Sequence, residues 1–151
     1  MILLVPLLIQ GGRAASPGLV CIASHGSTAC PTMPAALTGN KGSQVSVDVF
    51  IQGSDPMNGF DIVVLANHNT LNPINYAMGN VLTSPTVLVV CVGGKPVFPS
   101  PPAPPCSSSL PDTFELAAAM SGSLTPSPTT GLLFTVVYNI TGTTPSLNGI
   151  P

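Results

Sequence analysis

The chain has 151 residues, a length that fits one domain with a core of its own. Only 5% of its residues are charged, whereas an ordinary soluble domain is roughly one quarter charged, so the surface must be built from Ser, Thr, Asn, Gly and Pro. The 3 basic residues cannot form the positive patch that phosphate groups require, which excludes nucleic acid as a partner.

The chain begins with an apolar run, MILLVPLLIQ, which we treat as part of a separate segment, residues 1–16. This run is too short to span a bilayer, and Pro6 interrupts it. Two interpretations stay open. The run can be the remnant of a secretory signal, with a small-residue cleavage site at residues 14–16. It can instead be a donor strand that binds a neighbouring copy through its aliphatic side chains, namely Ile2, Leu4, Leu7 and Ile9.

The four cysteines form two local pairs, Cys21 with Cys30 and Cys91 with Cys106. Four cysteines allow three connectivities, but each local pair closes a loop of turn-forming residues, so we expect two local disulfides. Zinc is the less favoured alternative, because no CxxC is present and no histidine has ligand spacing to a cysteine. Disulfides favour an extracellular or cell-surface location.

Six apolar, β-branched runs separated by Gly, Pro, Ser and Asn predict an all-β fold. They are residues 18–23, 45–51, 60–66, 86–92, 113–119 and 132–141. The segment LAAAM, residues 116–120, has helix-forming composition but is too short for a stable helix, so we expect a strand there as well. Residues 96–111 are rich in proline and predict an exposed loop.

Two of the runs have a period of two, which predicts one core-facing side for each strand. In the first of these, the core-facing residues are Val45, Val47, Val49 and Ile51. In the last run, they are Leu132, Phe134, Val136, Tyr138 and Ile140.

Three segments carry a family resemblance: QVSVDVFIQ (44–52), GFDIVVLANHNTLNP (59–73) and GLLFTVVYNITG (131–142). They resemble the cohesin-like modules of the carbohydrate-binding β-sandwich superfamily, of the type found on archaeal and bacterial cell surfaces. The resemblance implies that residues 17–151 form a two-sheet antiparallel sandwich with jelly-roll or Greek-key connections. It also implies a further strand after the third segment, and because the sequence stops at Pro151 we expect the sandwich to lack this closing strand.

Catalysis is not predicted, because few titratable residues are available and none forms a recognisable constellation. His25 and His68 are expected in loops without a catalytic partner, and no GxSxG motif marks a nucleophile. Asp55, Asn58 and Asp61 could supply oxygen ligands for calcium, but their sequence context is better explained by a turn. We therefore expect no enzyme activity, no metal site and no cofactor.

Carbohydrate binding is implied by the family resemblance, but the chain has no Trp and only 2 Tyr with which to stack on sugar rings. The sequon Asn139-Ile140-Thr141 predicts N-glycosylation at Asn139.

The leading functional hypothesis is a non-catalytic, extracellular assembly module, a subunit of a surface filament or adhesive layer that associates with itself. A sheet that lacks a strand accepts one from elsewhere, and we expect the donor strand to insert beside residues 132–141 of a neighbour. The alternative is a carbohydrate-binding or dockerin-type protein-binding module of a larger cell-surface protein.

Overall fold

The computed structural model describes residues 17–33, 37–98, 105–120, 129–142 and 147–148. In this part of the chain there are nine strands and no helix. The strands are β1 (Pro17–Ser24), β2 (Gln44–Ser54), β3 (Gly59–Ala66), β4 (Leu71–Met78), β5 (Pro85–Val92), β6 (Lys95–Phe98), β7 (Thr113–Met120), β8 (Gly131–Ile140) and β9 (Leu147–Asn148).

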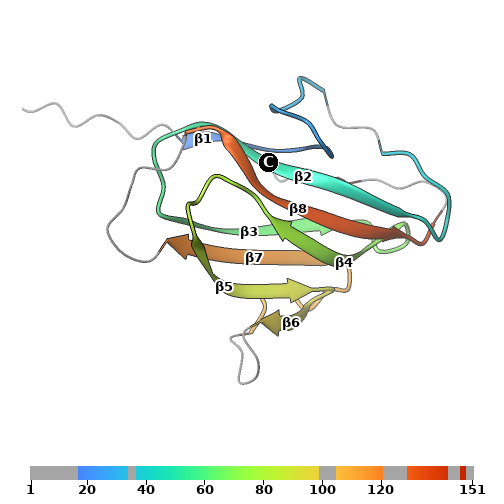
Figure 1. Ribbon diagram of the computed structural model, residues 1–151. Coiled ribbons are helices and arrows are strands. Elements are labelled where there is room, and N and C mark those ends of the chain that lie inside the picture. The colour runs from blue at the N-terminus through green and yellow to red at the C-terminus, as the bar shows by residue number, and fades with distance from the viewer. Residues whose placement is uncertain (1–16, 34–36, 99–104, 121–128, 143–146, 149–151) are drawn as a thin grey trace, which may run out of the picture.

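The strands form two sheets that pack face to face (Figure 1). Sheet A has the order β1-β2-β8-β4, and sheet B has the order β6-β5-β7-β3-β9. All neighbouring strands are antiparallel. From β2 to β5 the chain alternates between the sheets, so most strands pair with partners that are distant in sequence. The predicted all-β, two-sheet antiparallel sandwich is confirmed.

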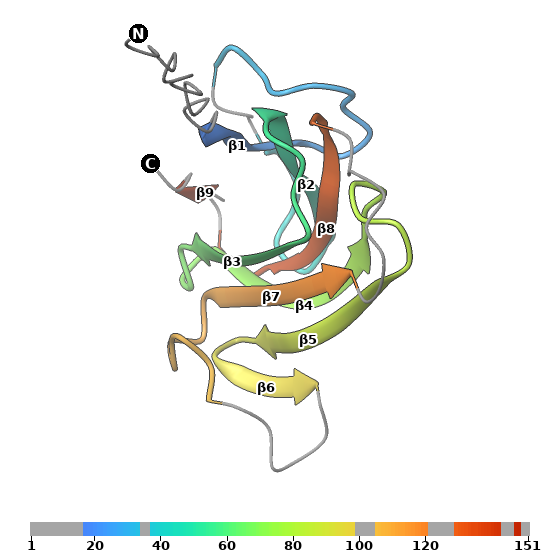
Figure 2. The same ribbon diagram turned by 90° about the vertical axis from the view of Figure 1, so that its left-hand side faces the viewer.

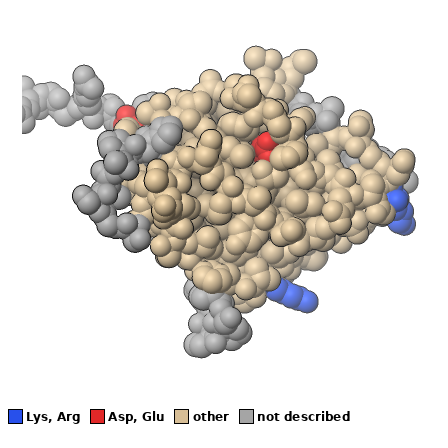
Figure 3. All heavy atoms as spheres, in the orientation of Figure 1, with Lys and Arg blue, Asp and Glu red and all other residues tan. Residues whose placement is uncertain are grey.

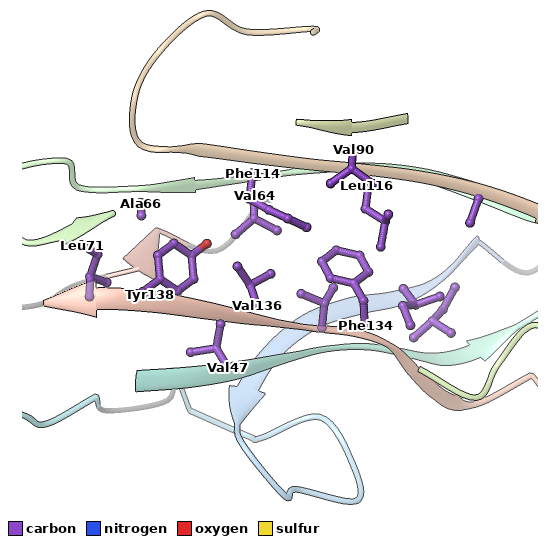
Figure 4. Packing of buried hydrophobic residues seen from close by; sticks show 14 of the residues in the cluster. Val47, Val64, Ala66, Leu71, Val90, Phe114, Leu116, Phe134, Val136 and Tyr138 are labelled. Atoms are coloured by element: carbon purple, nitrogen blue, oxygen red, sulfur yellow. The ribbon is translucent and has the colours of Figure 1, made fainter. Parts of the chain in front are cut away.

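The core lies between the sheets and is lined by the alternating residues of the interior strands. Val47 and Val49 of β2 are buried, as predicted from their period of two, and pair with Val136 and Phe134 of β8. Sheet B contributes a second layer of buried side chains, including Phe114 (Figure 4). The Phe114 and Phe134 ring centroids lie 5.6 Å apart, so aromatic packing joins the two sheets directly.

One residue of the predicted core face of β8 is wrong. The pairing of β2 with β8 shifts between Val49 and Phe50, whose partners are Phe134 and Leu132. Strand β8 therefore holds an extra residue at this β-bulge, and Leu133, only 1% exposed, enters the core in place of Leu132. A strict period of two cannot anticipate this shift, because a bulge reverses the alternation on one strand only.

Strands β4 and β6 were not predicted, and both contain proline. In β4 the pairing with β8 shifts between Pro73 and Asn75, next to a residue that cannot donate a backbone hydrogen bond. In β6, Pro96 lies on an edge strand, where proline is tolerated. Residues 96–98 therefore belong to a strand rather than to the expected proline-rich loop. The LAAAM segment lies in β7, which confirms that it is a strand.

The expected absence of a strand after β8 is corrected. Strand β9 follows β8 in sequence and pairs with Leu65 and Ala66 of β3, although it is only two residues long. Figure 2 shows that β9 and β1 lie on the same side of the sandwich, at the edges of their sheets. Strand β8 itself is paired on both sides, with β2 and β4, so it cannot accept a donor strand as expected.

We predict that Phe134→Ala lowers the free energy of unfolding by about 3–5 kcal/mol, because its fully buried ring packs on both Phe60 and Phe114. Phe98→Ala is the matched control, since this ring is 45% exposed on β6, and it should cost less than about 1 kcal/mol. Urea unfolding of the two variants measures the difference. Equal losses would contradict the assigned core.

Candidate functional site

Two disulfides hold loops against the sandwich. Cys21 is joined to Cys30 with a Cα–Cα distance of 5.8 Å, and Cys91 to Cys106 with one of 6.0 Å. These are the two local pairs expected from the sequence. The first ties the loop after β1 back to β1 itself, and the second ties β5 to the segment before β7.

The loop after β1 is also held by a buried carboxylate. Asp48 of β2 is 2% exposed and accepts hydrogen bonds from Thr135 Oγ1 at 2.6 Å, Gly26 N at 2.8 Å and His25 Nδ1 at 2.9 Å. Burial alone would raise the pKa of Asp48, but these hydrogen bonds outweigh it and hold the pKa below its ordinary value. Asp48 thus joins β2, β8 and the loop through one charged group.

The second histidine also contacts an aspartate. His68 Nδ1 lies 3.5 Å from Asp112 Oδ2, which joins the turn before β4 to the turn before β7. Within the described residues, Asp112 Oδ1 and Tyr138 Oη are buried without a hydrogen-bond partner. Burial first, and then the charge of Asp112, raises the pKa of Tyr138 far above its ordinary value, so its hydroxyl stays neutral. Figure 4 shows this hydroxyl pointing across the core towards the sheet that carries Val64.

No local sequence pattern marks these aspartate partners, because Asp48 and Asp112 are distant from the histidines along the chain. A catalytic triad requires the other ring nitrogen, Nε2, to contact a nucleophile. Among the described residues, no hydroxyl or thiol forms a hydrogen bond with Nε2 of His25 or His68. The contacts of both histidines instead position loops.

A second buried acid lies beside the second disulfide. Glu115 of β7 accepts hydrogen bonds from both N and Oγ of Ser107, each at 2.7 Å. The sulfur atoms of Cys91 and Cys106 and a carboxylate oxygen of Glu115 lie within 4.8 Å of one another. Both sulfur atoms are bonded to each other, however, and metal binding requires thiolates. This cluster therefore fixes the loop before β7.

The aromatic residues do not form a sugar-binding platform. Phe114, Phe134, Tyr138 and Phe50 are buried. Phe60 and Tyr76 are partly buried and pack against the core. Phe98 is the one exposed ring of the chain's 7 aromatic residues, all of which are described. A row of exposed rings, which stacking on a polysaccharide needs, is therefore not formed.

The outer edge of β1, like those of β4, β6 and β9, has no strand partner among the described residues. Ile140 N donates to Ser43 O, and this fixes which backbone groups of β2 face β8. By alternation along β2, the backbone N–H and C=O groups of Asp48 and Phe50 face β1, where these two residues pair with Ala23 and Cys21. In β1, the residues that alternate with Cys21 and Ala23 are Val20 and Ile22. Their N–H and C=O groups therefore point away from β2, towards the open edge.

The side chains of the same two residues face the interior. Val20 and Ile22 stand opposite Ile51 and Val49, which lie in the core. Ile22 is only partly buried and Val20 is 37% exposed. This edge therefore combines unpaired backbone groups with apolar side chains that are incompletely covered. We name it the β1 edge, defined by Val20 and Ile22.

The expected donor residues Ile2, Leu4, Leu7 and Ile9, and the whole segment 1–16, lie outside the described residues. Asn139 of the predicted sequon is described and lies in β8, partly exposed. The described part of the chain contains no helix with the length and hydropathy needed to cross a membrane.

No protein-family model matches the sequence, and no curated protein matches it significantly. Among solved structures, the chain is similar to a non-cellulosomal cohesin from the hyperthermophilic archaeon Archaeoglobus fulgidus, with 17% sequence identity and a TM-score of 0.49. The match covers 81% of this chain and 65% of that cohesin, so the chain spans slightly less than two thirds of its length.

We predict that the stability contributed by Asp48 depends on pH. Because its folded-state pKa is below the ordinary value of 3.8, the contribution is fully present above that value and is lost as the pH falls through the folded-state pKa. Asp48→Asn should cost about 1–3 kcal/mol at neutral pH and flatten this loss, since three hydrogen bonds to a buried carboxylate are weakened. Urea unfolding between neutral pH and pH about 2 measures both effects.

Asp61→Asn is the control with the opposite sign. Burial and then the charge of Glu115 raise the pKa of Asp61, so ionising this exposed carboxylate destabilises the fold as the pH rises above the ordinary value. Asp61→Asn should therefore lose no stability at neutral pH. If Asp48→Asn behaves like Asp61→Asn, the anchoring role of Asp48 is wrong.

Proposed function

We propose that the chain is an extracellular, non-catalytic structural module that assembles with copies of itself into a surface filament or layer. Each copy accepts an extended segment, residues 1–10 of a neighbour, along the β1 edge. The observation that carries the proposal is the coincidence at Val20 and Ile22 of unpaired backbone groups and incompletely buried apolar side chains. An added strand satisfies both needs at once.

The N-terminal run suits this position in length and composition. A strand rises about 3.3 Å per residue, so ten residues are long enough to follow the eight residues of β1. Its side chains alternate in direction, and those on one side would cover Val20 and Ile22 at the open margin of the core. Pro6 cannot donate to a ladder, but a donor strand is an edge strand and tolerates proline on its outward side.

The energy of such a contact is sufficient for assembly. Burying one large aliphatic side chain contributes about 1.5–3 kcal/mol, so three or four of them outweigh a moderate cost of ordering the segment. Donor and acceptor surfaces are different, so the contact is heterologous and propagates as a filament unless it closes into a ring. If the segment instead folded back on its own β1, the chain would remain monomeric.

The composition of the surface and the disulfides support the location and the mode of association. Two disulfides fit an oxidising, extracellular environment. Figure 3 shows a face that is almost free of charged side chains, with Lys and acidic residues confined to a few points. Closely packed copies would therefore experience little electrostatic repulsion.

A second candidate function is binding of another protein through the outer face of sheet B. Leu65 is 45% exposed there, and Val63 and Val89 on the same face are partly exposed. Between these strands lie the small residues Ala117 and Ala119 of β7, and the exposed carboxylate of Asp61 stands opposite Ala117 on the same face. This face of apolar side chains and one carboxylate fits a protein partner, whereas the buried aromatic residues give no comparable support to carbohydrate binding.

We predict that the full chain sediments as an assembly and that deletion of residues 1–12 yields a folded monomer. Val20→Lys should weaken assembly by about tenfold or more, because it places a charge against the incoming strand. Leu19→Lys is the matched control: Leu19 is 55% exposed, but its backbone faces β2 and its side chain is on the outer face. Analytical ultracentrifugation and electron microscopy measure assembly, and circular dichroism checks folding.

Three results would contradict strand donation. The first is assembly of the chain that lacks residues 1–12. The second is a secreted protein whose N-terminus begins near Ser16, because the donor is then absent. The third is equal loss of assembly in Val20→Lys and Leu19→Lys.

A further inference from the structure

Asn139 lies on the outer face of sheet A, next to the last residue of the interior strand β8. Its neighbours in β8, Tyr138 and Ile140, are fully buried and point into the core, so Asn139 points outwards and is partly exposed. It stands directly opposite Gln44 of β2 on one side and Asn72 of β4 on the other. All of its immediate cross-strand neighbours are therefore uncharged amides.

The side chain of Asn139 is not needed by the fold. Within the described residues no hydrogen bond involves its amide group. Asn67 and Asn75 differ, because their Oδ1 atoms accept hydrogen bonds from the N–H groups of Asn69 and Tyr76 and stabilise the local backbone. A substituent could therefore be attached to the amide nitrogen of Asn139 without the loss of a hydrogen bond.

We propose that Asn139 carries an N-linked glycan that covers the outer face of sheet A. The sequon is complete, with Thr141 two residues on, and the half-exposed Thr141 is not part of the core. In the transfer, Asn139 Nδ2 forms a bond to C1 of a sugar on a lipid-linked diphosphate donor. The C1–O bond to the diphosphate breaks, the diphosphate leaves with the electron pair, and the amide loses one proton.

The structure also assigns the order of events. Asn139 and Ile140 lie in β8, which is bonded on both sides, and Thr141 follows this strand with its N donating to Thr70 O, so the sequon is held at the end of an interior strand. A transferase must bend the acceptor segment to reach Nδ2, which the finished sheet does not permit. The glycan is therefore added before sheet A closes.

The glycan has a consequence for the surfaces of the molecule. From the end of β8 it shields the adjoining part of sheet A, where Ser46 and Asn75 lie in the next row of residues. The β1 edge is two strands away, roughly 10 Å at the usual strand spacing, and sheet B is on the opposite side. Glycosylation thus removes one face from association and leaves the other surfaces free. This inference does not depend on strand donation.

The test is mass spectrometry of the chain secreted from a host that performs N-glycosylation. We expect a peptide containing Asn139 that carries a glycan, and conversion of this Asn to Asp by an amidase that removes N-glycans. Thr141→Ser keeps a hydroxyl and should retain the glycan, whereas Thr141→Val and Asn139→Gln should both lose it. If Asn139→Gln fails to be secreted, the Thr141 pair still decides the outcome.

The order of events is tested with the purified oligosaccharyl transferase and a lipid-linked diphosphate sugar. A synthetic peptide of residues 137–142 should be modified, and the folded, unglycosylated chain should not. An unmodified Asn139 peptide from secreted wild-type protein, in a host that modifies a second glycoprotein, overturns the proposal. Equal modification of the folded chain and the peptide overturns the proposed order.

Discussion

The position of β8 in the middle of sheet A is the constraint on which the rest of the structure depends. Its inner face supplies Phe134, Val136 and Tyr138 to the core, and its two edges are bonded to β2 and β4. Because this strand is saturated on three sides, nothing can be added to it except on its outer face. The surfaces open to association therefore lie elsewhere, at the sheet edges and on sheet B.

The two sides of the sandwich are closed to different degrees. On one side β4 and β5 follow each other in sequence and pass from sheet A to sheet B. On the other side β1 ends sheet A, and the short β9 covers only Leu65 and Ala66 of β3. Among the described residues, the outer edge of β1 thus has no strand partner next to two interior-facing side chains, Val20 and Ile22, that are incompletely covered.

The sequence predicted those parts of the fold that a single strand determines. The alternation of β2 identifies its core face, and short spacing identifies two local cysteine pairs. It failed where two strands determine the result: the bulge that brings Leu133 into the core depends on the register of β8 against β2. Strand β4 was missed because Pro73 normally argues against a strand, although its bulged pairing accommodates it.

The candidate sites show the same division. The sequon at Asn139 can be read from three residues, but its outward direction and its free amide depend on the neighbours in the sheet. The aspartate partners of His25 and His68 come from distant segments, and no local pattern marks them. The unpaired backbone groups of Val20 and Ile22 are still harder to predict. They depend on which residues of β2 direct their N–H and C=O groups to β8 and which direct them to β1. Sequence supplies the candidates, and strand register decides between them.

The contacts of the buried acidic residues explain why so few charged side chains lie on the surface. Of the chain's 5 acidic residues, Asp48 and Glu115 are buried, where each accepts hydrogen bonds that hold a loop. These carboxylates therefore act as internal loop anchors beside the disulfides and contribute little to the surface. What remains outside is a nearly neutral polar surface, which neither steers partners over long distances nor repels identical copies. The proposed association would therefore be decided at short range, by unpaired backbone groups, apolar side chains and any glycan that covers them.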